Sequence, residues 1–430
     1  MVNELRYFAR RKHYEYLEKL GMGVLATGLA LTLVGCGNSK SSSSSSKMDK
    51  TLKVSADPSY KSYMKSVIPK FEKKYNVKVK VSYKAMLDED DALKLDGPSG
   101  KGPDVLMAPY DRVGQMASQG QLSTVKLTSG RYNATGKKSV TYKNKVYAAP
   151  VTIESDVLYY NKKLIKTAPK NFKELEKLAS DKKYAYANDK TKSVAFLTQW
   201  TNFYNAFGVI KGYGGYVFAD GNTNAKKMGL NNSGAVEGLT YMTKWFTKYW
   251  PSGMQNVTSN ENFVTSQFTS NKTAAVIDGP WMAATYKKSN IDYGVAVLPK
   301  LNNGKDYQAF AGGKAWAISN YSKHKTAAQA WLDFISNKTN QNKLYKSASE
   351  IPANTAARKE AVSTGDDMAT AVSKQYDKDV PLINLPQMSE VWTPAQTMVT
   401  NAASGKMTPK QAANKAQKTI LTNISQKYDK

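Results

Sequence analysis

The chain has 430 residues, 41% of them hydrophobic and 22% charged, and a formal net charge of +28 at pH 7. This length predicts two lobes of roughly 150 to 200 residues each, and the composition beyond the N-terminus excludes both a disordered and an integral membrane protein. Nucleic acid is not an expected partner, because the lysines are spread along the whole chain without a dense arginine block. Ordinary attraction to an anionic cell envelope accounts for the same charge.

The first 35 residues have the layout of a secretory signal peptide. A basic run from Arg6 to Lys12 precedes an uncharged apolar stretch of 15 residues, Leu20 to Val34. A membrane-spanning helix needs about 20 apolar residues. We therefore expect a cleaved signal peptide over residues 1–35 rather than a permanent transmembrane anchor.

A lipidation motif follows the apolar stretch. Leu33-Val34-Gly35-Cys36 matches the bacterial lipobox, in which the cysteine receives the lipid and becomes the first residue of the mature chain. Cys36 is the single cysteine, which leaves no partner for a disulfide or a thiolate metal site. Ser41 to Ser46 is typical of a tether that buries no apolar surface. We expect residues 36–50 to hold a body, beginning near Thr51, at the extracellular face of the cell membrane.

Strand and helix patterns alternate at the start of this body. Leu52 to Ala56 alternates apolar with polar residues, Tyr60 to Phe71 repeats apolar residues at helical spacing, and Val77 to Tyr83 alternates again. Parallel strands need a crossover element between them, so this order predicts a parallel α/β sheet. Pro69 predicts a kink or an early end of the helix. Further short apolar runs are Val105 to Met107, Val146 to Val151, Ala274 to Ile277, Val295 to Leu298 and Ala315 to Ile318.

The last hundred residues have a helical pattern. Thr408-Pro409-Lys410-Gln411 is a capping-box start with proline at the first helical position. Gly405 is placed to close the preceding helix. This part of the chain therefore predicts helices rather than strands.

Seven segments stand out in the body, from about residue 51 to the C-terminus. They are Gly102-Pro103-Asp104-Val105-Leu106 with Tyr110-Asp111-Arg112, Ala149-Pro150-Val151 with Glu154 and Tyr160-Asn161-Lys162, Gly214-Gly215-Tyr216-Val217-Phe218, Asp278-Gly279-Pro280-Trp281, Tyr293-Gly294-Val295-Ala296-Val297-Leu298-Pro299, Leu385-Pro386-Gln387-Met388-Ser389 with Trp392, and Asn401-Ala402-Ala403-Ser404-Gly405. In their residues and in their order these segments resemble the bacterial maltose/maltodextrin-binding proteins, which are the solute receptors of ABC importers.

The resemblance implies an α/β, periplasmic-binding-protein-like fold of two lobes joined by three crossings, which closes by a hinge motion around a sugar. The crossings would lie near residues 150–154, 310–316 and 363–368. The N-lobe would comprise residues 51–152 and 315–364, and the C-lobe residues 153–312 and 366–430.

The resemblance also implies hydrogen-bonding sugar contacts. The family's Asp-Arg pair corresponds to Asp111 and Arg112, and this pair suits neighbouring hydroxyls because a carboxylate accepts and a guanidinium donates. Asp57 and Glu154 match two further sugar-contacting acids, with Tyr60 as the aromatic beside the first. The alternative for these charged residues is structural, as a surface ion pair or a helix cap.

Aromatic contacts are implied on the C-lobe side. Trp281 and Trp392 match the two tryptophans on which sugar rings lie in the family, and a flat indole covers the apolar face of a pyranose. We expect the segment from Trp200 to Tyr204 to supply another stacking surface, and we assign it to Tyr204. The alternative for each aromatic is a place in a core.

Four positions depart from the family's pattern. Ala108 replaces the tryptophan before the Asp-Arg pair, and Pro58 replaces the lysine after the first strand's aspartate. Thr393 and Gln396 replace the tyrosine and arginine that follow the final tryptophan. Sugar as the ligand class is therefore a firmer expectation than maltose itself.

The histidine content argues against an enzyme. His13 lies in the signal segment and His324 in a lysine-rich loop, so we predict no histidine-based triad, no metal site and no cofactor. The resemblance implies a monomer that binds a maltodextrin or a related oligosaccharide and delivers it to ABC permease subunits driven by a cytoplasmic ATPase. The rival hypotheses, a secreted carbohydrate-active enzyme and a cationic cell-surface adhesin, have no motif of their own.

Overall fold

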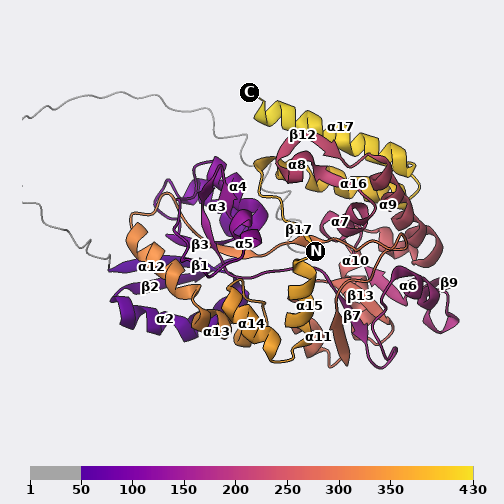
Figure 1. Cartoon of the computed structure of the whole chain (residues 1–430), viewed down its shortest axis with the longest axis horizontal. Helices are drawn as coiled ribbons and strands as arrows, with labels where there is room; N and C mark the ends of the chain where they lie inside the picture. The colour runs from indigo at the N-terminus through magenta and orange to yellow at the C-terminus, as the bar shows by residue number, and fades with distance from the viewer. Residues whose placement is uncertain (1–49, 430) are drawn as a thin grey trace, which may run out of the picture. The chain divides into compact units, whose positions relative to one another are not determined.

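The computed structural model describes residues 50–429, which form two packed lobes (Figure 1). The predicted signal peptide, Cys36 and the serine run lie outside the described residues. All residues from 50 to 429 belong to one compact unit, Met48–Lys430. No helix within this described range is long and apolar enough to cross a membrane.

A five-stranded sheet forms the first lobe, in the order β2-β1-β3-β16-β6. β1 (Thr51–Ala56) runs parallel to β2 (Lys78–Tyr83) and β3 (Val105–Pro109). β16 (Lys314–Ile318) is antiparallel to β3 and to β6 (Ala148–Pro150). The predicted parallel pairing is therefore right for β2, β1 and β3 and wrong for β16, because β16 returns from the other lobe and enters the sheet from the opposite end.

The side chains of β3 alternate between two layers of helices. Val105 and Met107 are buried in one cluster, and Leu106 and Ala108 are buried in the other. This period of two is expected for a strand that is covered on both faces. The first cluster includes residues of α2 (Lys61–Tyr75), α12 (Lys325–Ile335) and α13 (Lys338–Ala348), and the second includes residues of α3 (Met86–Asp96) and α4 (Tyr110–Ser118).

The proline in α2 does not end the helix. α2 continues past Pro69 to Tyr75 and stops where Asn76 takes a left-handed φ of 54°. Pro69 and Lys65 both lie on the exposed side of the helix. Water can therefore satisfy the Lys65 carbonyl, which loses its intrahelical donor to the proline. The predicted early end of this helix was wrong for that reason.

A four-stranded mixed sheet forms the second lobe, in the order β10-β13-β7-β14. β7 (Val157–Asn161) is antiparallel to β13 (Ala275–Asp278) and to β14 (Tyr293–Ala296), and β10 (Phe196–Thr198) is parallel to β13. Five buried aromatic residues pack beside this sheet, with neighbouring ring centroids 5.0 to 6.3 Å apart: Phe172, Phe196, Trp200, Trp245 and Trp250. Trp200 thus belongs to a core.

The remaining elements are shorter or lie around the two sheets. The helices are α5 (Ala134–Ser139), α6 (Phe172–Ala179), α7 (Phe203–Gly212), α8 (Ala219–Asn222), α9 (Ser233–Lys244), α10 (Asn260–Thr269), α11 (Ala283–Lys288), α14 (Thr355–Ser363), α15 (Asp367–Tyr376), α16 (Trp392–Ala403) and α17 (Pro409–Tyr428). The short helical turns are η1 (Pro58–Tyr60), η2 (Lys182–Tyr184), η3 (Trp245–Tyr249), η4 (Ser252–Gln255), η5 (Pro280–Met282) and η6 (Pro386–Glu390). The minor strands are β4 (Thr141–Tyr142), β5 (Lys145–Val146), β8 (Ala185–Tyr186), β9 (Asp189–Ser193), β11 (Tyr216–Phe218), β12 (Asn224–Gly229), β15 (Phe310–Ala311) and β17 (Val380–Pro381).

Three crossings connect the lobes, as predicted. The chain crosses between β6 and β7, between β15 and β16, and between α14, which packs on α13, and α15, which packs on β7 and β14. The first two crossings are tied to each other, because Glu154 and Gly312 exchange two backbone hydrogen bonds of 3.0 and 2.9 Å. Movement of one lobe against the other therefore bends paired segments rather than isolated ones.

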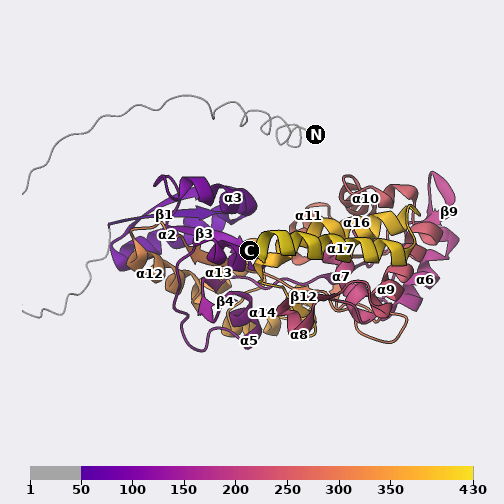
Figure 2. The same ribbon diagram turned by 90° about the horizontal axis from the view of Figure 1, so that it is seen from above.

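The C-terminal helix begins with the predicted capping box. The hydroxyl oxygen of Thr408 accepts from the Gln411 backbone N–H, and the side-chain oxygen of Gln411 accepts from the Thr408 backbone N–H. α17 packs against α16, and Figure 2 shows the two helices lying side by side. The cap therefore fixes the start of a helix that helps to cover the second lobe.

We expect Thr408→Ala to lower the free energy of unfolding by about 1 kcal/mol, because it removes the acceptor for an N-terminal N–H. Thr422→Ala is the matched control, since Thr422 is exposed within the same helix and alanine has the higher helix propensity. Urea denaturation of both variants measures the difference. Equal destabilisation by the two substitutions would contradict a capping role.

Candidate ligand-binding cleft

A cavity of about 530 Å³ lies where the two lobes meet. This volume falls within the range of about 300 to 1,000 Å³ that is usual for small-molecule sites. The cavity opens at the carboxyl end of β3, the edge of an α/β sheet where ligands generally bind. Its lining residues are Met86, Leu87, Pro109, Asp111, Arg112, Gln115, Glu154, Tyr204, Gly312, Gly313, Leu382, Ser389, Trp392 and Thr393.

Asp111 and Arg112 reach the cavity because α4 begins directly where β3 ends. Burial raises the pKa of Asp111, and the positive charge of Arg112 opposes that rise. Nη1 of Arg112 lies 3.2 Å from Oδ1 of the exposed Asp91 on α3. A guanidinium has five N–H donors, so this contact orients Arg112 without using all of them. The pair therefore presents an acceptor and a donor side by side.

Glu154 lines the cavity from the first crossing and is held from behind by Lys314. Nζ of Lys314 lies 3.1 Å from Glu154 Oε1 and 2.7 Å from Glu350 Oε1. Burial raises the pKa of Glu154, whereas the Lys314 charge lowers it. Burial also lowers the pKa of Lys314, but the two carboxylates together raise it by more. Lys314 therefore stays charged between two acids at the junction of the lobes.

Tyr60 supports this ion pair and does not line the cavity. Its side chain is fully buried, and its hydroxyl donates to Oε2 of Glu350. Nζ of Lys314 lies 5.8 Å from the centre of the Tyr60 ring, within the range of a cation–π contact. The structure thus places Tyr60 behind the cleft, where it restrains Glu350 and Lys314.

Asp57 caps a short helical turn. Its Oδ1 accepts from the backbone N–H of Ser59 at 3.0 Å and from the Ser59 hydroxyl at 2.6 Å. The side chain is half-buried, and the residue is absent from the cavity lining. At Asp57 the structure therefore shows a helix cap, which was the structural alternative for this residue.

Tyr204 and Trp392 line the opposite wall of the cleft, whereas Trp281 is absent from the cavity lining and lies beside Tyr204. The Tyr204 ring lies 5.9 Å from the exposed Trp281 ring at an interplanar angle of 69°, and 5.7 Å from the Phe310 ring. The Trp392 ring lies 5.9 Å from the Phe310 ring. The Trp281 side chain is 41% exposed, which is a large fraction because tryptophan side chains are mostly buried in folded proteins. A Cβ at Gly279 would lie 2.1 Å from the Trp281 ring, so a side chain there would displace the ring from this position.

Sequence reasoning missed two residues that organise the cleft, Lys314 and Glu350, and several that line it, among them Leu87. Lys314 had a signal, since it is a lone charge at the start of the otherwise apolar run Ala315 to Ile318. Glu350 and Leu87 had none, because Glu350 lies in a loop after α13 and Leu87 within an acidic helix. Leu87 is 49% exposed, and this exposure points to a functional role only because Leu87 lines the cavity.

A buried acidic group lies behind the cleft at the start of the second lobe. Asp156 accepts from Nδ2 of Asn205 at 3.2 Å, and the Ser155 hydroxyl donates to Asp379. Burial raises the pKa of Asp379 to about 7, and burial together with neighbouring carboxylates raises that of Asp156 well above its usual value. These bonds connect the first crossing to the segment that leads into β17.

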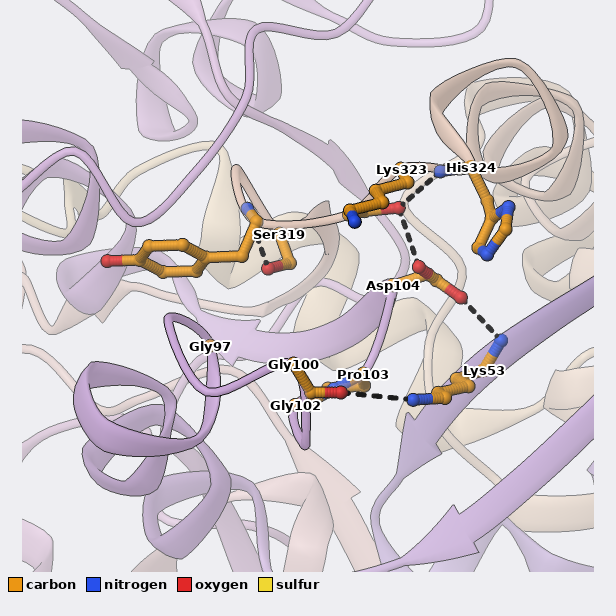
Figure 3. A pocket seen from close by; sticks show the side chains of 11 residues that line it. Lys53, Gly97, Gly100, Gly102, Pro103, Asp104, Ser319, Lys323 and His324 are labelled. Atoms are coloured by element: carbon orange, nitrogen blue, oxygen red, sulfur yellow. Dashed lines mark hydrogen bonds between the residues drawn. The ribbon is translucent and has the colours of Figure 1, made fainter. Parts of the chain in front are cut away.

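A smaller cavity of about 210 Å³ lies at the other end of β3 (Figure 3). Asp104 accepts there from the Lys53 backbone N–H at 2.7 Å and from the Ser322 hydroxyl at 2.6 Å. Nζ of Lys53 donates to the Gly100 carbonyl at 3.2 Å. These contacts tie β1, the loop before β3 and the loop after β16 together. Asp104 therefore holds loops in place, and we assign the ligand site to the larger cleft.

The acidic residues do not form a metal centre. Among residues 50–429, no group of three or more histidine, cysteine, aspartate or glutamate side chains is arranged to hold a metal ion.

Comparison with known proteins defines the class. Residues 56–342 match the family described as bacterial extracellular solute-binding protein. The chain belongs to this family. The predictions of a two-lobed solute-binding fold and of a binding protein rather than an enzyme are thereby confirmed.

Particular relatives are similar over most of their length. The maltodextrin-binding protein MdxE of Bacillus subtilis is 45% identical over 416 residues, 96% of this chain and 100% of that protein. A maltooligosaccharide ABC transporter solute-binding lipoprotein of Streptococcus pneumoniae is 47% identical over 94% of this chain and 96% of its own. The crystal structure of MalE from Listeria monocytogenes with maltose is 50% identical, with a TM-score of 0.83, and covers 88% of this chain and 99% of that one. The resemblance inferred from the seven segments is confirmed.

We expect Lys314→Met to lower the free energy of unfolding by about 3 kcal/mol near pH 7, because it leaves two buried carboxylates without their shared cation. The loss of Lys314 raises the folded-state pKa of Glu154 further above its unfolded value. Protonation then relieves the repulsion, so the deficit should shrink as the pH falls towards about 5. Urea denaturation at both pH values measures this change.

Lys314→Arg is the matched control for that experiment, because it keeps the positive charge. It should lose less stability and show a weaker dependence on pH. A deficit of Lys314→Met that is the same at both pH values would contradict the ion-pair role.

Proposed function

We propose that the chain is the extracellular, lipid-anchored receptor of an ABC importer and that it captures maltodextrins between its two lobes. The observation that carries the proposal is the interlobe cavity of about 530 Å³, lined by an Asp-Arg pair on one lobe and by the aromatic rings of Tyr204 and Trp392 on the other. The solute-binding family supports the receptor role. The names of two relatives and the maltose bound to a third support the ligand.

The two walls of the cleft suit the two chemical aspects of a pyranose. Trp281 and Trp392 offer flat apolar surfaces on which the CH face of a sugar ring is covered with little loss of side-chain freedom. Asp111 and Glu154 accept hydrogen bonds from hydroxyls, and Arg112 donates to them. A ligand with both an apolar face and a dense rim of hydroxyls satisfies both walls at once, as a glucose polymer does.

The two lobes close around a sugar because each lobe contributes different contacts to it. A ligand favours the closed state only through contacts that exist there and not in the open state. Asp111 and Arg112 belong to the first lobe, whereas Tyr204, Trp281 and Trp392 belong to the second. A sugar that touches both sets draws the lobes together about the paired crossings, and the closed form is the one delivered to the permease subunits and their cytoplasmic ATPase.

We also propose the lobe boundaries and the lipid attachment. The N-lobe comprises residues 51–152 and 315–364, and the C-lobe residues 153–312 and 366–430. The strands of the five-stranded sheet fall in or at the edge of the first set, and those of the four-stranded sheet fall in the second, which supports this division. Cys36 is the proposed lipidation site, supported by its lipobox and by the lipoprotein relative.

The same receptor role for a different oligosaccharide is the second candidate. Thr393 lines the cavity directly after Trp392, where the resembling family has a tyrosine, and Ala108 is fully buried in β3, where that family has a tryptophan. Both changes remove aromatic surface from the neighbourhood of the site. The titration below includes sugars that separate the two candidates.

We expect tryptophan fluorescence of the unlipidated body to change saturably with maltose, maltotriose and longer maltodextrins, but not with unrelated di- and trisaccharides. Trp281→Ala and Trp392→Ala should each weaken maltodextrin binding by about tenfold or more, which corresponds to the loss of one ring-stacking contact. Calorimetric titration of the same variants measures affinity without relying on the removed fluorophore.

Tyr321→Ala is the control for these variants, because Tyr321 is also an exposed aromatic, 37% exposed, but lies at the far end of β3. It should bind maltodextrins as the unmodified body does. A response only to another sugar would replace maltodextrin by that sugar, and silence across the whole panel would overturn the receptor proposal.

We expect maltodextrin affinity to fall as the pH is lowered from about 7 to about 5. Burial raises the pKa of Asp111 and of Glu154, so both carboxyls gain protons at a higher pH than exposed acids do and then lose acceptor capacity. Asp111→Asn should bind less tightly and respond less to pH. Asp88→Asn on the exposed side of α3 is the control and should keep the pH profile of the unmodified body. A profile of Asp111→Asn identical to that of the unmodified body would contradict the role of Asp111.

A further inference from the structure

The chain enters the described body at the end of the first lobe that is opposite to the cleft. The Lys50 carbonyl accepts from the Lys78 backbone N–H at 2.8 Å, and Thr51 is paired with Lys78, so the parallel strands β1 and β2 both begin here. β1 ends at Ala56, and β2 ends at Tyr83, three residues before Met86 of the cleft lining, so both strands run towards the cleft. Figures 1 and 2 show β1, α2 and α12 at the end of the first lobe that lies far from α6 and β9 of the second.

This end of the first lobe gathers lysines. α2 carries Lys70, Lys73 and Lys74 in its last turns, Lys50 and Lys78 begin the strands beside it, and Lys343 comes from α13. We name these six residues the basal pole. Residues 50–80 contain nine lysines and two acidic residues, whereas the whole chain has 62 basic and 34 acidic residues. The pole is therefore more basic than the general charge of the chain explains.

The neighbouring carboxylate does not neutralise the basal pole. Glu72 is the acidic residue of α2, and its oxygens are already engaged by Nζ of Lys78 at 3.2 Å and by the Val79 backbone N–H at 2.9 Å. Lys343 meets a like charge, because a side-chain contact with Lys70 is the main cause that lowers its pKa. Two ammonium groups held this close repel each other unless an anion lies between or above them.

A structural explanation covers part of the pole. Lys73 and Lys74 lie at the C-terminus of α2, where positive charge complements the helix dipole. That explanation does not extend to Lys50, Lys78 and Lys343, which belong to two strands and another helix. The meeting of lysines from four segments, namely α2, the start of β1, β2 and α13, is what distinguishes the pole from an ordinary helix end.

The position of the pole identifies its partner. Fourteen residues lead from Cys36 to Lys50, and an extended chain spans at most about 3.5 Å per residue, so the proposed lipid can lie no more than about 50 Å from the pole. The surface of a membrane with acidic lipids attracts lysines within about a Debye length and strengthens binding several-fold for each one. This step rests on the lipid anchor of the proposed function, whereas the charge of the pole does not.

We infer that the basal pole is a docking surface for anionic lipid headgroups. The pole adds an electrostatic contact to the covalent lipid, a combination of two weak signals that anchors more firmly than either one. The body then rests on the first lobe with the cleft at the end directed away from the bilayer. Because the contact is electrostatic, it breaks and reforms readily and leaves the receptor free to reach a permease.

The test uses the unlipidated body, which contains all of the described residues, and vesicles of phosphatidylcholine with or without phosphatidylglycerol. The body should sediment with the phosphatidylglycerol vesicles at low salt and be released by added sodium chloride. Lys70→Gln/Lys73→Gln/Lys74→Gln should weaken this partition by about tenfold or more, as expected for three lysines at an anionic surface. The matched control, Lys162→Gln/Lys166→Gln/Lys182→Gln, removes the same charge from exposed positions of the second lobe and should bind nearly as the unmodified body does.

Other results overturn the inference. If both triple variants lose vesicle binding equally, the binding depends on net charge and not on the basal pole. If the unmodified body binds neither kind of vesicle, the basal pole is not a lipid-docking surface. Binding to soluble polyphosphate without binding to vesicles assigns the pole to a polymer rather than to lipid. Sugar titration of each variant separates this inference from the proposed function, because pole-dependent vesicle binding without any sugar response would leave the pole standing and the receptor proposal refuted.

Discussion

A single ammonium group, that of Lys314, sits where the lobes, the crossings and the cleft come together. It lies between the carboxylates of Glu154 in the first crossing and Glu350 in the loop after α13, and β16, which begins with Lys314, follows the second crossing. Charges removed from water are tolerable only when they are paired, so the sheet, the hinge and Glu154 in the cavity lining must keep their positions together. The backbone bonds between Glu154 and Gly312 reinforce this arrangement. The position of Glu154 in the cleft therefore depends on the paired segments that form the hinge.

The cleft divides its chemistry between two lobes that are built differently. The first lobe supplies Asp111 and Arg112 at a point where a strand passes directly into a helix, a junction whose backbone geometry is stiff. The second lobe supplies Tyr204, Trp281 and Trp392 from a helix start, a short helical turn and another helix start. The first lobe thus offers groups for directional hydrogen bonds, whereas the second lobe offers flat apolar surface. Sugar binding requires both, because hydroxyls demand direction and ring faces demand contact.

The strong positive charge of the chain is distributed in a way that keeps it out of the cleft. Arg112 is held by Asp91, and Lys314 is held by two carboxylates, so the charges near the ligand site are paired. Six lysines, of which Lys78 is paired with Glu72, gather instead at the basal pole, on the far side of the first lobe. A neutral oligosaccharide thus meets a site without a large net field, while the anionic envelope meets the lysines.

The lipobox, the alternation of strands with helices, the capping box at Thr408 and the seven family segments could all be read from the sequence, because each depends on residues that are neighbours in the chain. The antiparallel entry of β16, the continuation of α2 past Pro69 and the withdrawal of Tyr60 behind Lys314 could not. Tyr60 is separated from Glu350 by 290 residues, and whether its hydroxyl faces a sugar or a carboxylate depends on which elements pack between them. Local sequence thus determined the class of fold and five of the residues that line the cavity: Asp111, Arg112, Glu154, Tyr204 and Trp392. The tertiary structure alone decided which of the predicted residues face the cavity, because burial and ion pairing arise between segments that meet only when the lobes are formed.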